Sequence, residues 1–479
     1  MHRAPYRPGR RRLLRSGAVA AAAGMASTWL AACSSPSTHA GPQPANHVET
    51  VPFQLYFVGP PLDATAMRLI QSFVDKTFNA KHKGVRAVFQ SPYNLQQVAT
   101  DVVAGSSAPV VVASCCNDWN VILPFLEKLD PWLKKDNINT SLWTAGQLAR
   151  FQLPTGLYGL PEDAASEAYL YRQDILDQIG LTYPDPNWTS VEAQHLWSQC
   201  SGIVHGKRRY GTTCPWGNGG VPEGLSAVVH GWNGAFSNAA RTRCLLDDPG
   251  SIKCGEYWMD MVWNQVATVG DGWPNQGIFN GSVVFTQGAE PTILQAVLNL
   301  GSAAKWDFIP YPRFPARPVG VLHDNFYGML ASAKNKELAW ELLKFAAIDS
   351  EWSRFYMKVA LAPPALPHLL SEWITILRST APVLKNKHLE YWTEPTLRGE
   401  GFYDFEFFRY LPTNANGVFN SVWPTIWNRK TSVHAGFTAI AKQINAIESA
   451  APAKLKQQES LTRAFPTRGP AAATVTPGL

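Results

Sequence analysis

The sequence predicts an α/β protein with two lobes, and two observations lead to this prediction. Strand-like and helix-like segments alternate between residues 51 and 113, which is the order expected of a parallel sheet covered by helices. Residues 156–181 begin with turn formers, carry the acidic pair Glu162 and Asp163, alternate like a strand and end in an amphipathic pattern. A strand with polar side chains at the point where it passes from one globular half into another is expected to lie at a cleft.

The first 33 residues are predicted to be an export signal. A basic segment ending at Arg15 precedes an uncharged, alanine-rich run over residues 16–32, as in secretory signals. Its arginines followed by two leucines resemble the twin-arginine export motif. Residues 30–33 (LAAC) resemble a bacterial lipobox, in which Cys33 would become lipidated. The alternative, a transmembrane anchor, is disfavoured because the run is shorter than the roughly 20 residues that span a bilayer.

Loss of the signal would leave a chain of balanced charge. Residues 1–32 contain six of the 42 basic residues and no acidic residue, so 36 basic side chains would remain against 36 acidic ones. No basic stripe interleaved with aromatic residues is present, and no nucleic-acid partner is therefore expected. Residues 34–47 are polar and rich in proline and glycine, which is typical of a flexible tether.

Six cysteines follow the signal, and an even number in an exported protein suggests disulfides. Cys244 and Cys254 form the first candidate pair, because the loop between them is short and rich in turn formers. Cys200 and Cys214 form the second. No CxxC motif or histidine cluster accompanies the cysteines, so neither a metal site nor a cofactor is predicted.

Local patterns predict the individual elements. Asp63 is a plausible N-cap, and the apolar run over 109–113 suits a strand buried on both faces. The predicted elements are strand 51–58, helix 63–79, strand 85–89, helix 94–104 and strand 109–113, then helices 196–204, 255–266, 291–300 and 335–347, with a strand in 281–290. The glycine-rich residues 217–220 lack a following lysine and a clear preceding strand, so they are not interpreted as a phosphate-binding loop.

Five segments in a fixed order resemble the extracellular solute-binding proteins of bacterial ABC importers, a family that includes the maltose-binding protein. Residues 305–347 carry the most specific part, in which a strand, a proline-containing loop, a second strand and a helix opening NKELAWELLKF occur together. The other segments are the lipobox, residues 108–119 with 126–135, residues 157–181 and residues 419–447. Together they cover nearly the whole mature chain.

The resemblance implies a periplasmic-binding-protein-like fold of type II, with two α/β lobes around a hinged ligand cleft. Lobe 1 is expected over residues 48–160 and 326–370, lobe 2 over 161–325 and 371–455, and a disordered tail over 456–479. It also implies a monomeric, lipid-anchored protein on the outer face of the cell membrane or in the periplasm. Such a protein would capture a small solute, most simply a mono- or oligosaccharide, and deliver it to permease subunits.

A sugar site should combine aromatic rings, on which sugar faces stack, with charged and amide side chains that bind the hydroxyls. For each candidate the alternative is a structural role, such as a helix cap or core packing. The candidate ligand-binding residues are Asp118 and Trp119 in lobe 1, Glu162 and Asp163 at the first crossing, Trp216, Trp232, Asn233 and Glu290 in lobe 2, Asp324 and Asn325 at the second crossing, and Phe419 in the aromatic region 401–424.

Two other functions are weighed against transport. A surface glycan-binding or sensor lipoprotein would use the same residues without any permease. A glycan-processing enzyme is disfavoured, because Glu162 and Asp163 are neighbours whose side chains would point to opposite faces of a strand and could not flank one glycosidic bond. Motifs such as GxSxG and HExxH do not occur, so no enzymatic activity is predicted.

Overall fold

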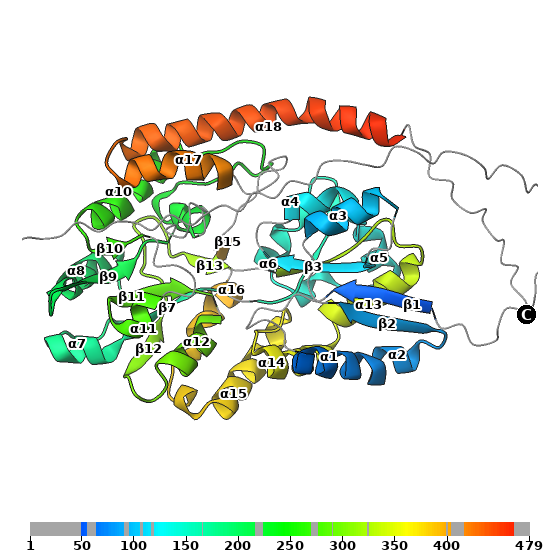
Figure 1. Ribbon diagram of the computed structural model, residues 1–479, viewed down its shortest axis with the longest axis horizontal. Coiled ribbons are helices and arrows are strands. Elements are labelled where there is room, and N and C mark those ends of the chain that lie inside the picture. The colour runs from blue at the N-terminus through cyan, green and yellow to red at the C-terminus, as the bar shows by residue number, and fades with distance from the viewer. Residues whose placement is uncertain are drawn as a thin grey trace, which may run out of the picture. The chain divides into compact units, whose positions relative to one another are not determined.

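The computed structural model describes residues 49–54, 64–90, 95–105, 109–115, 119–164, 166–215, 224–269, 276–289, 291–322, 325–398, 401–403 and 416–463. These residues fold into two α/β lobes, whose helices and strands are labelled in Figure 1. The predicted fold class is thereby confirmed.

The buried apolar strands that the sequence predicts in the first lobe lie in two small sheets. A parallel pair, β1 and β2, lies beside a second sheet with the order β3-β14-β6, and Val110 N donates to Pro52 O (2.9 Å) between them. Val111 and Val112 are fully buried, which explains the continuous apolar run at this point. The strands are β1 (Glu49–Gln54), β2 (Val85–Gln90), β3 (Val111–Cys115), β6 (Leu160–Pro161) and β14 (Asn325–Met329).

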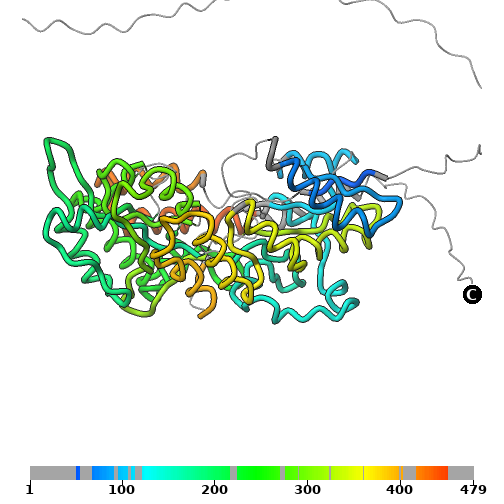
Figure 2. The backbone as a smooth tube through the Cα atoms, turned by 90° about the horizontal axis from the view of Figure 1, so that it is seen from below, coloured from blue at the N-terminus to red at the C-terminus, as the bar shows by residue number. Residues whose placement is uncertain are grey.

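Helices distant in sequence complete the first lobe. The predicted helix over 63–79 is divided at Thr77, and the ring of Phe345 packs against those of Phe73 and Phe78 with centroids 6.4 Å and 5.5 Å apart. Figure 2 shows the yellow segment that contains Phe345 beside the blue N-terminal segments. The helices are α1 (Ala64–Lys76), α2 (Phe78–Lys81), α3 (Leu95–Val103), α4 (Trp119–Ile122), α5 (Asp130–Lys135), α6 (Ala145–Ala149), α13 (Lys336–Ala347) and α14 (Ser350–Ala360).

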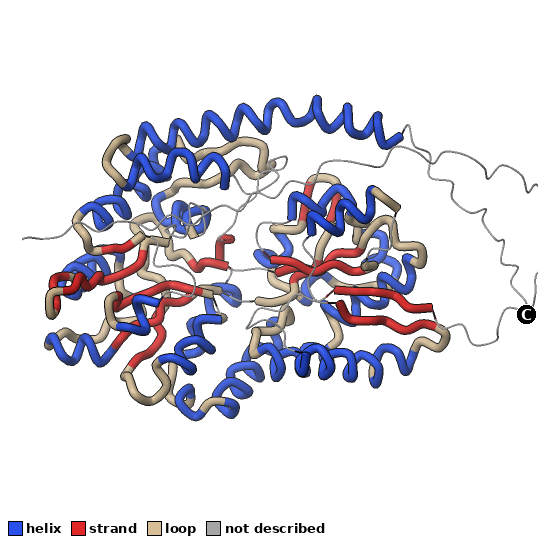
Figure 3. The backbone as a smooth tube through the Cα atoms, in the orientation of Figure 1, coloured by secondary structure: helices blue, strands red, loops and turns tan. Residues whose placement is uncertain are grey.

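The second lobe contains a mixed sheet with strand order β10-β9-β11-β7-β12, to which β8 is added beside β9. Strand β7 is antiparallel to both of its neighbours, whereas β9 is parallel to β10 and β11. Figure 3 shows these strands in red between helices in blue. The strands are β7 (Ala168–Arg172), β8 (Gly202–Val204), β9 (Lys207–Thr213), β10 (Ala267–Thr268), β11 (Val283–Gly288) and β12 (Trp306–Ile309).

The helix predicted over 196–204 is only partly correct. Helix α8 (Ser190–Cys200) begins with a capping box between Thr189 and Glu192 and ends before β8. His205 and Gly206 both have positive φ angles, which suits the two-residue turn between β8 and β9. The other main helices of this lobe are α7 (Gln173–Ile179), α10 (Pro249–Trp263), α12 (Pro291–Asn299), α17 (Asn416–Trp427) and α18 (Val433–Arg463).

Helix α18 extends further than the sequence predicts. It continues to Arg463 as one unbroken helix, coloured orange to red in Figure 1, where a disordered tail was expected from residue 456. Although Pro452 disfavours a helix, residues 453–463 consist mainly of alanine, leucine, lysine, arginine, glutamine and glutamate, and their helix propensity favours this continuation. Residues 464–479 lie outside the described part of the chain.

The predicted disulfides Cys244–Cys254 and Cys200–Cys214 are not formed, and all four residues are buried. Burial raises the pKa of the Cys200 thiol to about 12. Burial also raises the pKa of Cys254, and Cys214 raises it further. The cysteine that raises the pKa of Cys254 is thus Cys214, which belongs to the other predicted pair. The fold, and not the length of the intervening loop, decides which cysteines are neighbours.

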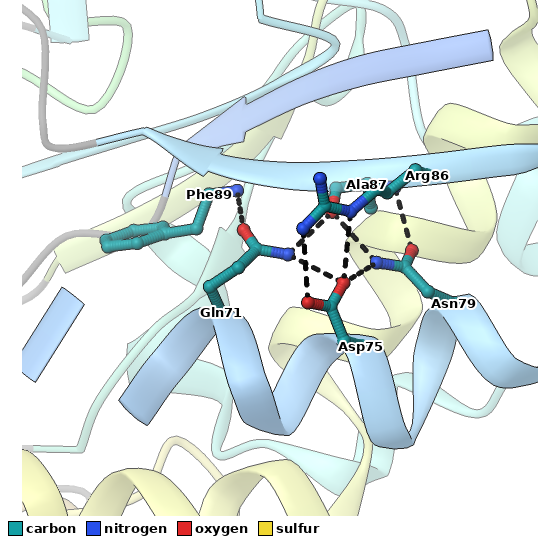
Figure 4. Close-up of polar contacts among 6 residues, drawn as sticks. All are labelled: Gln71, Asp75, Asn79, Arg86, Ala87 and Phe89. Carbon is teal, nitrogen blue, oxygen red and sulfur yellow. Dashed lines mark hydrogen bonds and ion pairs between the residues drawn. The ribbon is translucent and has the colours of Figure 1, made fainter. Parts of the chain in front are cut away.

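Side chains of α1 and α2 seal the free edge of β2 (Figure 4). Asn79 accepts a hydrogen bond from Ala87 N (2.7 Å) and donates to Ala87 O (3.0 Å). Gln71 accepts from Phe89 N (2.8 Å) and donates to the same Ala87 O (3.1 Å). These amides occupy the positions that an added strand would use, so they protect an edge that is otherwise prone to intermolecular pairing.

Asp75 holds the two amides in position. Its Oδ1 accepts from Gln71 Nε2 (3.0 Å) and Asn79 Nδ2 (2.7 Å), and its Oδ2 lies 3.3 Å from the guanidinium of Arg86. Burial raises the pKa of the Asp75 carboxyl, but hydrogen bonds from Arg86, Asn79 and Gln71 outweigh burial and hold this pKa below its ordinary value of 3.8. The folded state therefore favours the charged carboxylate.

We expect Asp75→Asn to destabilise the protein at neutral pH and to lose this effect in acid. A depressed pKa in the folded state contributes stability above the ordinary pKa of 3.8, and this stability disappears as the pH falls through the lower folded value. Urea unfolding of wild type and variant, from pH 7 downward, measures the difference. Asp260→Asn, at an exposed helix position, serves as the control. An Asp75→Asn difference that stays constant with pH would contradict this assignment.

Candidate functional site

Two segments run side by side between the lobes, and we call them the crossing pair. The first consists of residues 161–164 and 166–168, and the second of residues 320–322 and 325–326. Glu162 N donates to Asn325 O (3.0 Å), and Glu167 N donates to Val321 O (2.7 Å). A bridge between Ser166 and Leu322 lies between these bonds. The two segments are thus antiparallel and joined by backbone hydrogen bonds.

A third segment joins the crossing pair through two facing glycines. Strand β15 (Gly401–Tyr403) pairs in parallel with β13 (Gly320–Leu322), and Gly320 lies opposite Gly401. A Cβ at Gly320 would lie 2.1 Å from the Cβ of Pro395, and a Cβ at Gly401 would lie 2.4 Å from Leu322 Cδ2. Only residues without a side chain fit at this close approach.

The acidic pair of the first crossing lies inside the protein. Glu162 is 4% exposed, and its Oε1 accepts from the hydroxyl of Tyr356 (2.7 Å) on α14. Asp163 is 1% exposed, and its Oδ2 accepts from Asn325 Nδ2 (2.6 Å) while its Oδ1 accepts from Asn325 N (3.4 Å). The two neighbours therefore bind different partners, and Asp163 fastens the second crossing to the first.

Two tyrosines surround the carboxylate of Glu162. Burial is the main cause that raises the pKa of Tyr327 and Tyr356 well above the ordinary 10.0, and the charge of Glu162 raises both further. Both phenols therefore keep their protons at physiological pH. Gln147 of α6 is also buried, and its amide donates to the backbone oxygens of Asp163 (3.3 Å) and Ala365 (2.9 Å).

Further contacts hold the lobe-2 end of the first crossing. Glu167 is buried, and its Oε2 accepts from the hydroxyl of Tyr311 (2.5 Å). Ser166 Oγ donates to the backbone oxygen of Trp392 (2.7 Å). Sequence reasoning missed Tyr311, Tyr356 and Trp392, because their partners are far away in the chain and no local pattern marks them.

The lobe-2 candidates that the structure describes differ in how deeply they are buried. Trp232 is half-buried against Phe314, with ring centroids 4.5 Å apart, and Asn233 has a φ of +57° at the end of a short 3-10 helix. Phe419 was expected at the cleft, but it is 1% exposed and packs against Phe236 in the core. The reason is that Phe419 lies on the side of α17 that faces the core of the second lobe.

One aromatic pair near the crossing pair was not singled out from the sequence. The rings of His230 and Phe402 stack with centroids 4.0 Å apart and an interplanar angle of 16°, and both residues are partly exposed. Phe402 belongs to β15 and pairs with Val321 of the second crossing. The aromatic composition of residues 401–403 is the only sequence signal that could have indicated this pair.

The remaining candidates fall where the structure gives no side-chain description. Trp119 begins helix α4 (Trp119–Ile122). Cys33, Asp118, Trp216, Glu290 and Asp324 lie outside the described residues. Within the described ranges, no group of three or more His, Cys, Asp or Glu side chains is placed to hold a metal. Those ranges also contain no helix with the length and apolar character that a membrane span requires.

Comparisons with known proteins agree with this architecture. The family model described as bacterial extracellular solute-binding protein matches residues 63–349, more than half of the chain. No curated protein sequence matches. A substrate-binding protein of an ABC system from Listeria monocytogenes, solved with cycloalternan, is 15% identical with a TM-score of 0.65, over 83% of this chain and 98% of its own.

Two further solved structures show the same fold. The sugar-binding protein MalE from Xanthomonas citri is 16% identical with a TM-score of 0.65, over 85% of this chain and 99% of its own. The cyclic alpha-maltosyl-1,6-maltose binding protein from Arthrobacter globiformis is 16% identical with a TM-score of 0.65, over 83% of this chain and 98% of its own. At these identities the likeness establishes the fold.

Proposed function

Because this chain belongs to the bacterial extracellular solute-binding proteins, we propose that it captures a carbohydrate between its two lobes and delivers it to the permease subunits of an ABC importer. The observation that carries this proposal is the crossing pair, in which two backbone segments joined by hydrogen bonds pass between the α/β lobes. Proteins of this architecture close around a ligand by bending at such a connection.

Two observations support a carbohydrate as the ligand. The similar structures named above are described as binding cycloalternan, cyclic maltosyl-maltose and sugar. The partly exposed stack of His230 and Phe402 lies against the second crossing, and flat aromatic faces suit the apolar faces of sugar rings. The ligand contacts of Trp232 and Asn233, together with those of the candidates outside the described residues, belong to this proposal. Glu162, Asp163 and Asn325 are buried and bound to partners inside the protein, so we assign them a structural role at the crossing pair in place of the expected ligand contacts.

Hinge closure would couple ligand binding to a change in conformation. A ligand that contacts both lobes binds the closed form more tightly and shifts the population towards it. The closed form is then the one that permeases would recognise. Lipid anchoring through Cys33, a monomeric state and the lobe boundaries at residues 160, 325 and 370 complete the proposal. Solute-binding proteins bind and do not transform their ligands, so no reaction is proposed.

A ligand screen tests the proposal. We expect one or a few mono- or oligosaccharides to raise the melting temperature, because a ligand at 100 times its Kd stabilises the folded state by about 2.7 kcal/mol. The same sugar should reduce the radius of gyration in solution scattering. Polyamines, peptides and glycerol phosphodiesters serve as controls. Stabilisation by one of these classes and by no sugar would reject the carbohydrate assignment.

A further inference from the structure

We propose that Arg241 is a latch that holds the two lobes together beside the crossing pair and sets how easily they separate. The proposal rests on the proposed function only in so far as lobe closure controls ligand binding. The contact itself is described by the structure. The guanidinium of Arg241, from the second lobe, donates through Nη1 to Arg150 O (2.6 Å) and through Nη2 to Ala149 O (2.9 Å) in the first.

A tight turn presents Arg241 to the first lobe. Asn238 organises this turn: its backbone oxygen accepts from Arg241 N (2.8 Å), and its Oδ1 accepts from Thr242 N (2.8 Å) and Arg243 N (3.0 Å). Arg241 has a φ of +56°, a conformation that non-glycine residues rarely adopt. The turn thus keeps a strained backbone at the residue that reaches across to the other lobe.

The base of this turn is fixed to α18, the longest helix that the structure describes. Ser237 and Cys244 form a bridge, and the backbone of Cys244 is bound on both sides by the Asn445 side chain of α18. Asn445 Oδ1 accepts from Cys244 N (2.7 Å), and Asn445 Nδ2 donates to Cys244 O (3.4 Å). These bonds fix the base of the turn that carries Arg241 to the second lobe.

The receiving end is the C-terminus of α6, where backbone carbonyls lack partners within the helix and carry partial negative charge. A planar guanidinium donates two parallel hydrogen bonds to such a pair of carbonyls, which a lysine ammonium does not match. Helix α6 is in turn fixed to the first lobe and to the crossing, because Gln147 binds the backbone oxygens of Ala365 and Asp163. The latch therefore bridges two well-anchored parts.

The consequence is a bias in the population of lobe arrangements. When the arrangement that binds a ligand is only partly populated, the measured affinity falls by that fraction. Taking the latched arrangement as the one that binds ligand, loss of two charge-assisted hydrogen bonds should reduce its population, and we expect Arg241→Ala to weaken ligand affinity by about 3- to 10-fold. Arg241→Lys should show an intermediate effect, because it keeps the charge but loses the bidentate geometry.

The decisive experiment measures lobe separation in the full chain without ligand. Spin labels on unnatural side chains at Leu69 of α1 and Leu298 of α12, both exposed, report the distance between the lobes. We expect Arg241→Ala to broaden this distance distribution towards longer values. Arg243→Ala is the matched control, since it removes an exposed arginine from the same turn and should leave the distribution at that of wild type.

Each outcome decides one question. An Arg241→Ala distribution identical to that of wild type overturns the latch, even if sugars bind and the proposed function stands. A broadened distribution supports the latch even if no carbohydrate binds, since the measurement uses no ligand. If Arg241→Ala loses helical content in circular dichroism, Arg241→Lys provides the test, because it keeps the long charged side chain. A distance distribution and a ligand affinity equal to those of wild type in Arg241→Lys would overturn the role of the bidentate contact.

Discussion

Replacing Asp163 with alanine is expected to lower the free energy of unfolding by about 2–4 kcal/mol. The substitution removes the acceptor of Asn325 Nδ2, which is buried and would lose this partner, and it releases the second crossing from the first. Denaturant unfolding followed by circular dichroism measures the change. The large effect arises because water cannot replace the lost acceptor at a site that is 1% exposed.

The control is an acidic residue whose partners lie at the surface. Asp177 pairs with Lys305 at 3.0 Å and both side chains are about half exposed, so Asp177→Ala should change stability little. Asp163→Ala with a stability equal to that of Asp177→Ala would show that the Asp163–Asn325 contact contributes nothing to the connection between the lobes.

Gly320→Val is expected to destabilise the protein by about 1–3 kcal/mol. A valine side chain would overlap Pro395, whose Cβ lies 2.1 Å from the ideal Cβ position, so α16 (Glu394–Arg398) would have to move away from the second crossing. The same unfolding measurement detects this loss. If the protein binds a ligand as proposed, the variant should also bind it more weakly, because the third segment would no longer follow the crossing pair closely.

Gly417→Ala is the matched control for this substitution. Gly417 lies in α17, is exposed, and an added Cβ would meet no atom within 4 Å. Alanine in a helix is more favourable than glycine by roughly 0.5–1 kcal/mol, so this variant should be at least as stable as wild type. Equal stability of Gly320→Val and Gly417→Ala would mean that the close approach at β13 is not required.

The sequence predicts the fold well where local patterns decide the outcome. The apolar run of β3, the helix that begins at the Asn335 cap and the strand before α12 are all confirmed, because burial periodicity and capping leave a direct imprint on the chain. The helix predicted over 196–204 failed at Gly202, where pairing with β9 overrides the helical periodicity.

The site was harder to predict than the fold. Residue types and spacing pointed to Glu162, Asp163 and Asn325, but they could not reveal that Asp163 binds Asn325 or that Glu162 binds Tyr356 of α14. These contacts join residues that are more than 150 positions apart. The same limitation explains Phe419, the cysteine pairs and Arg241, whose roles depend on which surfaces the completed fold brings together.

The discontinuous first lobe determines the order in which the protein can fold during synthesis. Phe73 and Phe78 emerge early, yet their partners Phe345 and Trp352 are made only after the entire second sheet. At roughly 5–20 residues per second, the delay is on the order of tens of seconds. The first lobe therefore cannot be completed until the whole second sheet has been made, and the apolar face around Phe73 and Phe78 stays without these partners during that interval.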